Sequence, residues 1–285
     1  MCRIAGIFNP KEQQLQQRII AMRDSMRHGG PDDDGVYLHP SLPLALGHRR
    51  LSLIDLSANG HQPMHFYEAG LTIVFNGEIY NYREIKSTLQ HYGFVFQTES
   101  DTEVILKAYS YWGVEAFEFF NGMFALAIWD ERKQQLVLAR DHAGIKPLYY
   151  YLEGNTLIFG SEIRAFQYSG KKFEENQQWK TAFLTFGHLP EPVTTLHKVK
   201  PLPKGSALII DLPSLNTKKH YFFKWKFKNE LKFEEEALQL LRETLEQAVE
   251  RHMISDAPIG LFLSGGIDSS LLTLIASKTQ QTNLH

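Results

Sequence analysis

Short apolar runs separated by turns dominate the first three quarters of the chain. The runs that predict strands are 44–54, 71–75, 124–129, 136–140, 148–151 and 157–159. The connections at 130–134 and 153–155 are too short for crossovers, so they indicate antiparallel hairpins. Residues 1 to about 220 are therefore predicted to form an α+β domain built on antiparallel sheet.

Helical periodicity predicts three helices, one before these runs and two between them. The predicted helices are 10–27, 82–92 and 100–112. Asn9-Pro10 is typical of a helix start, and Gly93 of a helix end. Ser100 and Glu103 have the spacing of a capping box at the start of the third helix.

Beyond residue 220 the pattern changes to that of a parallel α/β domain. It predicts a helix over 233–253, a strand over 259–263 and an apolar helix over 271–276, with a glycine turn before the last. The Pro-rich segment 189–203 and the polar segment 218–232 are predicted to be connections. Because a lone parallel strand leaves its backbone groups unpaired, 221–285 is expected to be an incomplete domain, mobile or exposed.

Composition and charge argue against nucleic-acid-binding, membrane-spanning and secreted proteins. The 285 residues include 30 Lys plus Arg and 32 Asp plus Glu, a balance that argues against nucleic-acid binding. No apolar run approaches the roughly 18 residues of a membrane span, and the first residues lack the features of a signal peptide. A single cysteine excludes an internal disulfide and favours the cytoplasm. His61 and His65 are four apart, but Pro63 interrupts a helical pair, so no metal site is expected.

The single cysteine is Cys2, and its position next to the N-terminus makes it a candidate nucleophile. Removal of Met1 would leave a thiol and a free α-amine on one residue. An amine with a pKa of about 7.7–8.0 can act as base for a thiol with a pKa of about 8.5, as in N-terminal nucleophile enzymes. The alternative is a small buried apolar residue without a catalytic role.

The string SGGIDSS at 264–270 lies between a predicted strand and a predicted helix. Two glycines let backbone N–H groups approach an anion, and the start of the helix favours negative charge. The serines add donors, and Asp268 can organise the loop or a Mg²⁺ ion. A plain turn with a serine N-cap is the alternative, but the complete string favours phosphate binding. It is not a Walker A loop, because no Gly-Lys-Ser/Thr is present.

Three polar features in the first part each have two interpretations. Asn76-Gly77 is a strong hairpin signal, but an Asn amide beside a Gly N–H also suits an oxyanion hole. Arg50, with Arg49, is either a solvated basic pair or a clamp for a substrate carboxylate. Asp101 is either favoured by the helix dipole or a partner for a substrate ammonium.

Taken together, these segments resemble a known family. In chain order they are Cys2, Gly30-Pro31-Asp32, GHRRLS at 47–52, NGEIYN at 76–81, Ser100-Asp101, Arg140-Asp141 and SGGIDSS. The whole chain is similar to glutamine-hydrolysing asparagine synthetases, which contain a class II glutamine amidotransferase domain. The resemblance implies an N-terminal nucleophile αββα sandwich of antiparallel sheets over 1–220. It also implies the truncated beginning of a parallel α/β pyrophosphate-loop domain over 221–285.

The resemblance assigns roles in a glutamine site. Cys2 would attack the side-chain amide of glutamine, with Asn76 and Gly77 forming the oxyanion hole. Arg50 would hold the α-carboxylate of glutamine. The α-amino group would be held by Asp101 and Glu78, and the pocket would also be lined by Leu51, Ser52, Leu53 and Ile54.

The resemblance further implies a synthetase reaction. In the family, the released ammonia attacks a β-aspartyl-AMP made from aspartate and ATP. Glutamine, aspartate and ATP with Mg²⁺ are then the small-molecule partners, without a prosthetic group, and a homodimer is a possible assembly. The implied ATP contacts are Phe262, Leu263, Ser264, Gly265, Gly266, Asp268, Ser269 and Ser270.

Two positions depart from the family pattern. The family usually has Arg-Gly-Pro-Asp after the first helix, whereas this chain has Gly29 in place of the arginine. This puts the order of the loop and its affinity for glutamine in question. Arg3 stands where Gly or Ser is usual, directly after the proposed nucleophile.

Alternative functions remain open at this point. One is a relative with the same plan but another carboxylate acceptor, such as a β-lactam synthetase. Another is a fragment that retains only glutaminase activity, or an inactive binding module. Cys2 favours glutamine hydrolysis, since relatives with other acceptors often lack the cysteine. Because a nucleotide domain needs about 100–150 residues, the chain as given is expected to hydrolyse glutamine without making asparagine.

Overall fold

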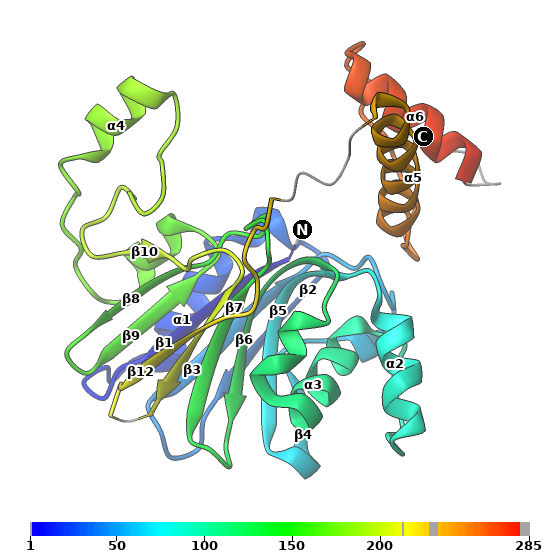
Figure 1. Ribbon diagram of the computed structural model, residues 1–285. Helices are drawn as coiled ribbons and strands as arrows, with labels where there is room; N and C mark the ends of the chain where they lie inside the picture. The colour runs from blue at the N-terminus through cyan, green and yellow to red at the C-terminus, as the bar shows by residue number, and fades with distance from the viewer. Residues whose placement is uncertain (1, 213, 228–232, 280–285) are drawn as a thin grey trace.

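Two six-stranded antiparallel sheets lie face to face in the middle of the protein (Figure 1). The computed structural model describes residues 2–212, 214–227 and 233–279. The strand order is β10-β8-β9-β1-β3-β2 in the first sheet and β12-β11-β7-β6-β5-β4 in the second. The strands of the first sheet are β1 Arg3–Phe8, β2 Asp33–Leu38, β3 Leu44–Arg50, β8 Tyr149–Glu153, β9 Thr156–Gly160 and β10 Lys200–Pro201. Those of the second are β4 Met64–Phe66, β5 Leu71–Ile79, β6 Gly122–Asp130, β7 Gln135–Arg140, β11 Ser206–Asp211 and β12 Thr217–Tyr221.

Helices cover the outer faces of both sheets. Helix α1 (Leu15–Asp24) packs on the first sheet through Ile19 and Met22. Helices α2 (Tyr82–His91) and α3 (Asp101–Trp112) pack on the second sheet. Short 3₁₀ turns lie at Arg27–Gly29, Ala58–Gly60, Tyr67–Ala69, Gly113–Glu118 and Ile163–Tyr168. The predicted αββα sandwich is confirmed.

Strand β6 shows why the central strands read as continuous apolar runs. Ala125, Ala127 and Trp129 face the core between the two sheets. Phe124, Leu126 and Ile128 face the helices that cover the second sheet. Since successive side chains of a strand point to opposite faces, a strand buried on both faces needs apolar residues at nearly every position. The hairpins β6–β7 and β8–β9 pair as the short turns predicted.

The predicted helix starts are partly wrong. Asn9 forms a turn in which its Oδ1 accepts a hydrogen bond from the Lys11 N–H at 3.0 Å, so α1 begins only at Leu15. Ser100 does cap α3, since its Oγ accepts from the Thr102 N–H at 3.2 Å. The carboxylate of Glu103 instead accepts from the backbone of Gln97 and Thr98, so the reciprocal half of the capping box is absent.

The Asn-Gly signal at 76–77 does not mark a turn. Strand β5 continues through both residues to Ile79, and Gly77 lies opposite Phe124 of β6. A Cβ atom at Gly77 would lie 2.1 Å from the Met123 carbonyl oxygen, so only glycine fits this close approach of two backbones. The hairpin interpretation of Asn76-Gly77 is therefore wrong.

The last part of the chain contains helices α5 (Glu234–His252) and α6 (Ile267–Thr279), which contact each other. The strand predicted over 259–263 does not form, because no neighbouring strand in the described ranges pairs with it. Segment 218–232 was predicted as a connection, but β12 occupies its beginning, while 228–232 lies outside the described residues. Among the described helices, none is long and apolar enough to cross a membrane.

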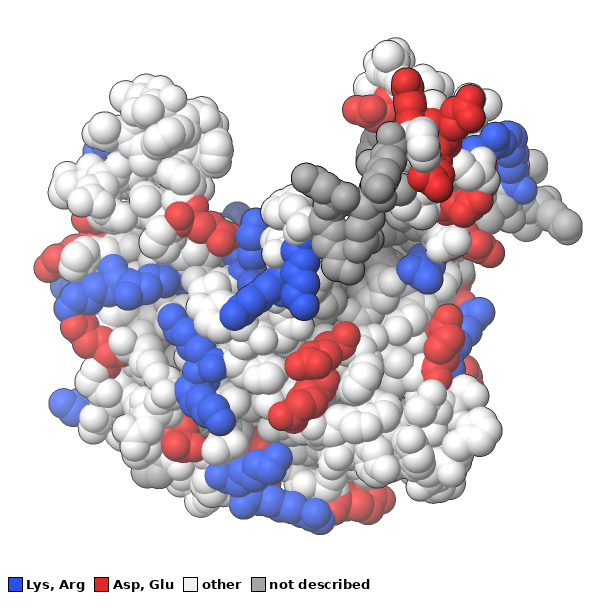
Figure 2. All heavy atoms as spheres, in the orientation of Figure 1, with Lys and Arg blue, Asp and Glu red and all other residues white. Residues whose placement is uncertain are grey.

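Helix α4 (Trp179–Phe186), which the sequence pattern did not predict, projects from the body of the protein (Figure 1). Its side chains Phe183, Leu184 and Phe186 are exposed. Few charged side chains appear on this lobe in the view of Figure 2. Such an apolar surface is unusual on an isolated protein.

Asp141 organises the turn after β7 from a fully buried position. Its Oδ2 accepts hydrogen bonds from the backbone N–H groups of Phe124 (3.1 Å) and Lys146 (2.9 Å). Its Oδ1 accepts from those of Ala143 (3.1 Å) and Ile145 (2.9 Å). One carboxylate thus satisfies four backbone donors, of which those of Phe124 and Lys146 are buried and need a partner within the protein.

Replacing Asp141 by alanine is expected to lower the free energy of unfolding by about 3–4 kcal/mol, because two buried and two part-buried backbone donors lose a charged acceptor. Urea denaturation followed by circular dichroism measures the change. Glu174→Ala, at an exposed position, serves as control and should change stability by less than about 0.5 kcal/mol. Equal stability of the two variants would contradict this account of the turn.

Candidate active site

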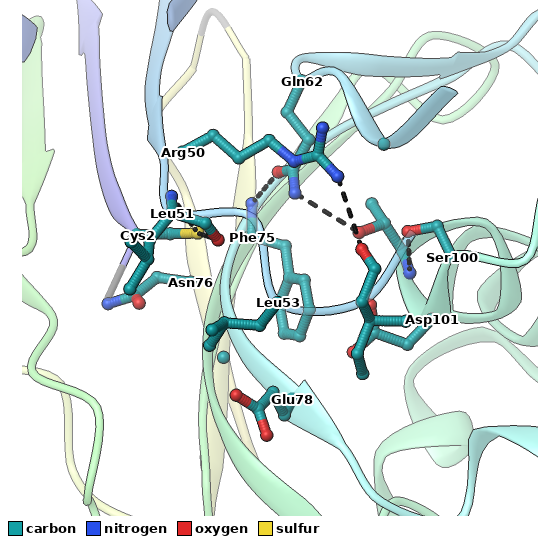
Figure 3. A pocket seen from close by; sticks show the side chains of 14 residues that line it. Cys2, Arg50, Leu51, Leu53, Gln62, Phe75, Asn76, Glu78, Ser100 and Asp101 are labelled. Atoms are coloured by element: carbon teal, nitrogen blue, oxygen red, sulfur yellow. Dashed lines mark hydrogen bonds between the residues drawn. The ribbon is translucent and has the colours of Figure 1, made fainter. Parts of the chain in front are cut away.

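One pocket lies where the chain before β1, the end of β3, strand β5 and the start of α3 meet (Figure 3). Cys2 and Asn76 lie beside each other in this view, and Asp101 lies across the pocket from them. The lining residues are Cys2, Arg50, Leu51, Leu53, Ile54, Gly60, Gln62, Phe75, Asn76, Gly77, Glu78, Ser100, Asp101 and Thr102. Segments from four distant parts of the sequence therefore build a single site.

The thiol of Cys2 is held against the backbone of Leu51. The Leu51 N–H donates to Sγ at 3.3 Å, and the thiol donates to the Leu51 carbonyl oxygen at 3.5 Å. Burial raises the pKa of the Cys2 thiol above its ordinary value, and the Leu51 N–H opposes this shift only in part. The thiol is therefore mainly protonated at neutral pH and needs a base to become a nucleophile.

The side chain of Asn76 is buried without a partner. Its exposed fraction is 1%, and neither Nδ2 nor Oδ1 has a hydrogen-bond partner in the described part of the chain. Such an amide costs free energy in a folded protein, so it calls for an explanation. Its place beside Cys2 makes it available to donate to a group bound at the thiol.

Two acidic side chains in the pocket have pKa values shifted upward. Burial raises the pKa of Asp101 to about 7, with a further contribution from the charge of Glu78. The Ile79 N–H donates to Asp101 Oδ2 at 3.0 Å and favours the ionised form. Burial also raises the pKa of Glu78, while the ammonium of Lys146 opposes the shift. A cation bound near both carboxylates would stabilise their charged forms.

The guanidinium of Arg50 binds the backbone of the segment that follows β3. Its guanidinium donates to the carbonyl oxygens of Ser57 (2.8 Å) and Ile54 (3.3 Å) and to that of Asp55. A Cβ atom at Gly60 would lie 1.9 Å from Arg50 Nη2, so glycine is required for this packing. Arg50 thus shapes the pocket wall as well as placing a positive charge in it.

The structure brings together nearly all residues that the sequence assigned to glutamine. Cys2, Arg50, Leu51, Leu53, Ile54, Asn76, Gly77, Glu78 and Asp101 all line the pocket. Ser52 is not among the lining residues, and its N–H donates to Asp32 Oδ2 at 2.8 Å. Arg49 points elsewhere and pairs with Asp34 at 2.9 Å. The roles of the lining residues remain predictions.

Sequence reasoning missed five of the lining residues, namely Gly60, Gln62, Phe75, Ser100 and Thr102. Gln62 connects β5 to α3, because its Oε1 accepts from the Phe75 N–H at 2.6 Å and its Nε2 donates to Thr102 Oγ1 at 3.3 Å. Nothing in the local pattern around Gln62 signals this role. Ser100 did carry a signal, since a helix N-cap directly precedes Asp101.

The predicted ATP contacts lie apart from this pocket, before and within the first turn of α6. Phe262 and Leu263 are exposed, and Gly265 has a positive φ of 81° with open space where a Cβ would lie. The hydroxyls of Ser264 and Ser269 lie 3.1 Å apart. Gly266 directly precedes α6, and Asp268 and Ser270 lie in its first turn. Within the described ranges there is no group of three His, Cys, Asp or Glu side chains that could hold a metal ion.

The two departures from the family pattern meet in space. Arg3 pairs with Glu162 at 2.6 Å, and Glu162 also lies 2.9 Å from His28. A Cβ atom at Gly29 would lie 2.7 Å from Arg3 Cζ. A side chain at position 29 would therefore collide with Arg3 in its present position.

Comparisons with known proteins identify the family of the chain. Residues 1–222 match the family model described as glutamine amidotransferase domain, and residues 240–285 match that of asparagine synthase. The chain belongs to the glutamine amidotransferase domain family. The resemblance to glutamine-hydrolysing asparagine synthetases is thereby confirmed.

Curated relatives carry the same description. Asparagine synthetase (glutamine-hydrolyzing) 1 of Bacillus subtilis is 39% identical over 282 residues, which are 98% of this chain and 44% of the relative. A putative asparagine synthetase (glutamine-hydrolyzing) 2 of Methanocaldococcus jannaschii is 34% identical over 305 residues, 100% of this chain and 59% of the relative. The chain thus spans about half the length of these relatives.

A solved structure supports the fold. Glutamine phosphoribosylpyrophosphate amidotransferase of Bacillus subtilis superposes with a TM-score of 0.58 at 17% identity, covering 97% of this chain and 64% of the other. At this identity the likeness concerns the fold alone.

The raised pKa of Cys2 predicts how this thiol reacts with iodoacetamide. Because the thiolate is the reacting form, the rate should rise about tenfold per pH unit from pH 7 to 9 without a plateau. Mass spectrometry follows the single cysteine directly. The chain unfolded in urea is the control, and its rate should level off near the ordinary cysteine pKa of about 8.5. A plateau below pH 8 in the folded protein would contradict the raised pKa.

Proposed function

We propose that residues 1–220 form a glutaminase domain in which Cys2 is the nucleophile. Once Met1 is removed, the α-amine of Cys2 accepts the thiol proton as the sulfur attacks the side-chain amide carbon of glutamine. The C–N bond then breaks, ammonia leaves with a proton from the amine, and a glutamyl thioester remains. Water hydrolyses the thioester to glutamate and frees the thiol.

The buried amide of Asn76 is the observation that carries this proposal. It lies beside Cys2 and has no partner among the described residues, so its Nδ2 donors can bind the oxyanion of the tetrahedral intermediate. The Gly77 N–H is the second donor in this assignment. A preformed donor stabilises the transition state without reorganisation, which makes an otherwise costly orphan amide useful.

The remaining polar groups suit the two ends of the amino acid. Arg50 supplies a positive charge for the α-carboxylate of glutamine, and Asp101 with Glu78 supply negative charge for its α-ammonium. Leu51, Leu53 and Ile54 line the wall of the same pocket. This arrangement explains why carboxylates with raised pKa values lie in a site that otherwise disfavours their charge.

We further propose that 221–285 begins the ATP-dependent half of a glutamine-dependent asparagine synthetase. The ammonia would amidate aspartate through a β-aspartyl-AMP, with ATP and Mg²⁺ supplied as substrate. Gly265 with its positive φ, the hydroxyl of Ser264 before α6 and those of Ser269 and Ser270 in its first turn suit a phosphate group, since they leave open space and donors at a helix start. The match of 240–285 to asparagine synthase supports this part.

Substitution of the nucleophile and of the oxyanion donor tests the glutaminase. Cys2→Ala should abolish glutamate release, and Asn76→Ala should lower kcat by about 10²–10³-fold because one oxyanion donor is lost. Hydroxylamine trapping should yield glutamyl hydroxamate from the wild type and none from Cys2→Ala. Far-ultraviolet circular dichroism serves as the folding control. Near-wild-type turnover of either variant would remove the role assigned to that residue.

The pKa of Asp101 predicts a pH dependence of glutamine binding. Below pH 7 this carboxyl is mostly neutral, and above pH 7 it is ionised and attracts the substrate ammonium. The KM for glutamine should therefore fall about 5–10-fold between pH 6 and pH 8. Asp101→Asn, which keeps the size of the side chain, should have a high KM that hardly changes over this range. A KM equally pH-dependent in this variant would assign the titration to another group.

A further inference from the structure

Two residues that follow α5 contact the wall of the glutamine pocket. We call residues 51–57 the pocket loop, since they connect β3 to the next turn and include three lining residues. The Asp256 N–H donates to the Leu53 carbonyl oxygen at 2.8 Å. The Asp256 carboxylate accepts from the Asp55 N–H at 2.7 Å. Ser255 Oγ also lies 3.4 Å from the Leu53 oxygen.

These contacts bind a part of the pocket loop that has an uncommon backbone conformation. The loop contains no helix or strand, and Asp55 has a positive φ of 53°, which is uncommon for a residue other than glycine. Arg50 binds the Ile54 and Asp55 carbonyl oxygens through its guanidinium. Asp256 binds the Asp55 N–H through its carboxylate and the Leu53 carbonyl oxygen through its backbone N–H. The peptide groups on both sides of Ile54, a lining residue, are thus fixed by Arg50 and Asp256, two residues 206 positions apart in the sequence.

The segment that carries Asp256 is itself anchored beside the site. The ring of His252, the last residue of α5, lies 4.4 Å from that of Tyr80. Ile254 packs against the core between the second sheet and its helices. Tyr80 directly follows β5, the strand that contains Asn76, Gly77 and Glu78. In the other direction, the chain passes from Asp256 to the SGGIDSS string.

We propose that Asp256 is a positioning residue for glutamine. By fixing residues 53–55 it sets the place of Ile54 in the pocket wall, and it thereby makes the affinity for glutamine depend on the position of the segment that leads to SGGIDSS. This inference rests on the proposed glutaminase. Asp256 is not among the residues that line the pocket, so it acts on glutamine through the residues of the pocket loop that it holds.

Kinetics of two Asp256 variants of the full chain test the proposal. Asp256→Ala should raise the KM for glutamine about 3–10-fold and leave kcat within about twofold, as loss of one charge-assisted hydrogen bond predicts. Asp256→Asn keeps an oxygen acceptor for the Asp55 N–H and should restore KM to within about twofold of the wild type. Glu250→Ala, on the exposed surface of α5, is the matched control and should keep both constants. An unchanged KM in Asp256→Ala would overturn the proposal.

Hydrogen exchange provides a readout that does not depend on activity. The amide of Asp55 should exchange several-fold faster in Asp256→Ala than in the wild type, whereas Glu250→Ala should not alter it. Equal exchange in the wild type and Asp256→Ala would show that Asp256 does not fix the loop, and would also overturn the proposal. A wild type that hydrolyses no glutamine would instead refute the glutaminase, which this measurement does not require.

Discussion

The close approach of β5 and β6 is the constraint on which the site depends. Glycines on both strands make it possible: a Cβ at Gly77 would lie 2.1 Å from the Met123 oxygen, and one at Gly122 would lie 2.1 Å from the Glu78 oxygen. The two backbones can therefore pair without interruption to Ile79. Because β5 continues this far, it carries Asn76 and Glu78 into the pocket beside Cys2, and it ends where Ile79 donates to the carboxylate of Asp101. A side chain at either glycine would separate the strands and displace all of these groups together.

Three polar side chains are buried near this strand, those of Asp141, Asn76 and Asp101. Asp141 is buried, and its four backbone donors hold the turn after β7, so its cost is offset within the fold. Asn76 is equally buried but has no such partners in the described part of the chain. Asp101 is held with a pKa near 7 by the same kind of burial. The contrast separates Asp141, whose carboxylate is satisfied by four backbone donors, from Asn76, whose amide has no partner among the described residues, and from Asp101, whose charge is disfavoured by burial.

The sequence predicted the antiparallel sandwich because apolar runs and short turns are local signals. It also predicted most of the pocket, since the motifs around Cys2, Arg50, Asn76 and Asp101 resemble a family whose site is known. Long-range contacts set the limits of this reasoning. Whether Asn76-Gly77 turns or continues depends on pairing with β6, some fifty residues later. The strand predicted over 259–263 has the right composition, yet a strand exists only when a neighbour pairs with it. Gly60 and Gln62 act through Arg50, Phe75 and Thr102, and no nearby pattern reveals those partners.

The pocket loop shows how a segment without its own secondary structure acquires a defined shape. Its first residue, Leu51, is hydrogen-bonded to the Cys2 sulfur, and Ser52 donates to Asp32. Its later residues are bound by Arg50 and by Asp256. Each of these partners belongs to a different part of the chain, so the loop reaches its final conformation only when the chain before β1, the end of β3 and the segment after α5 are all in place. Cys2 and the segment leading to SGGIDSS are consequently linked through five residues, Leu51 to Asp55. Ile54 lies between the two sets of contacts and lines the pocket, so its position depends on both.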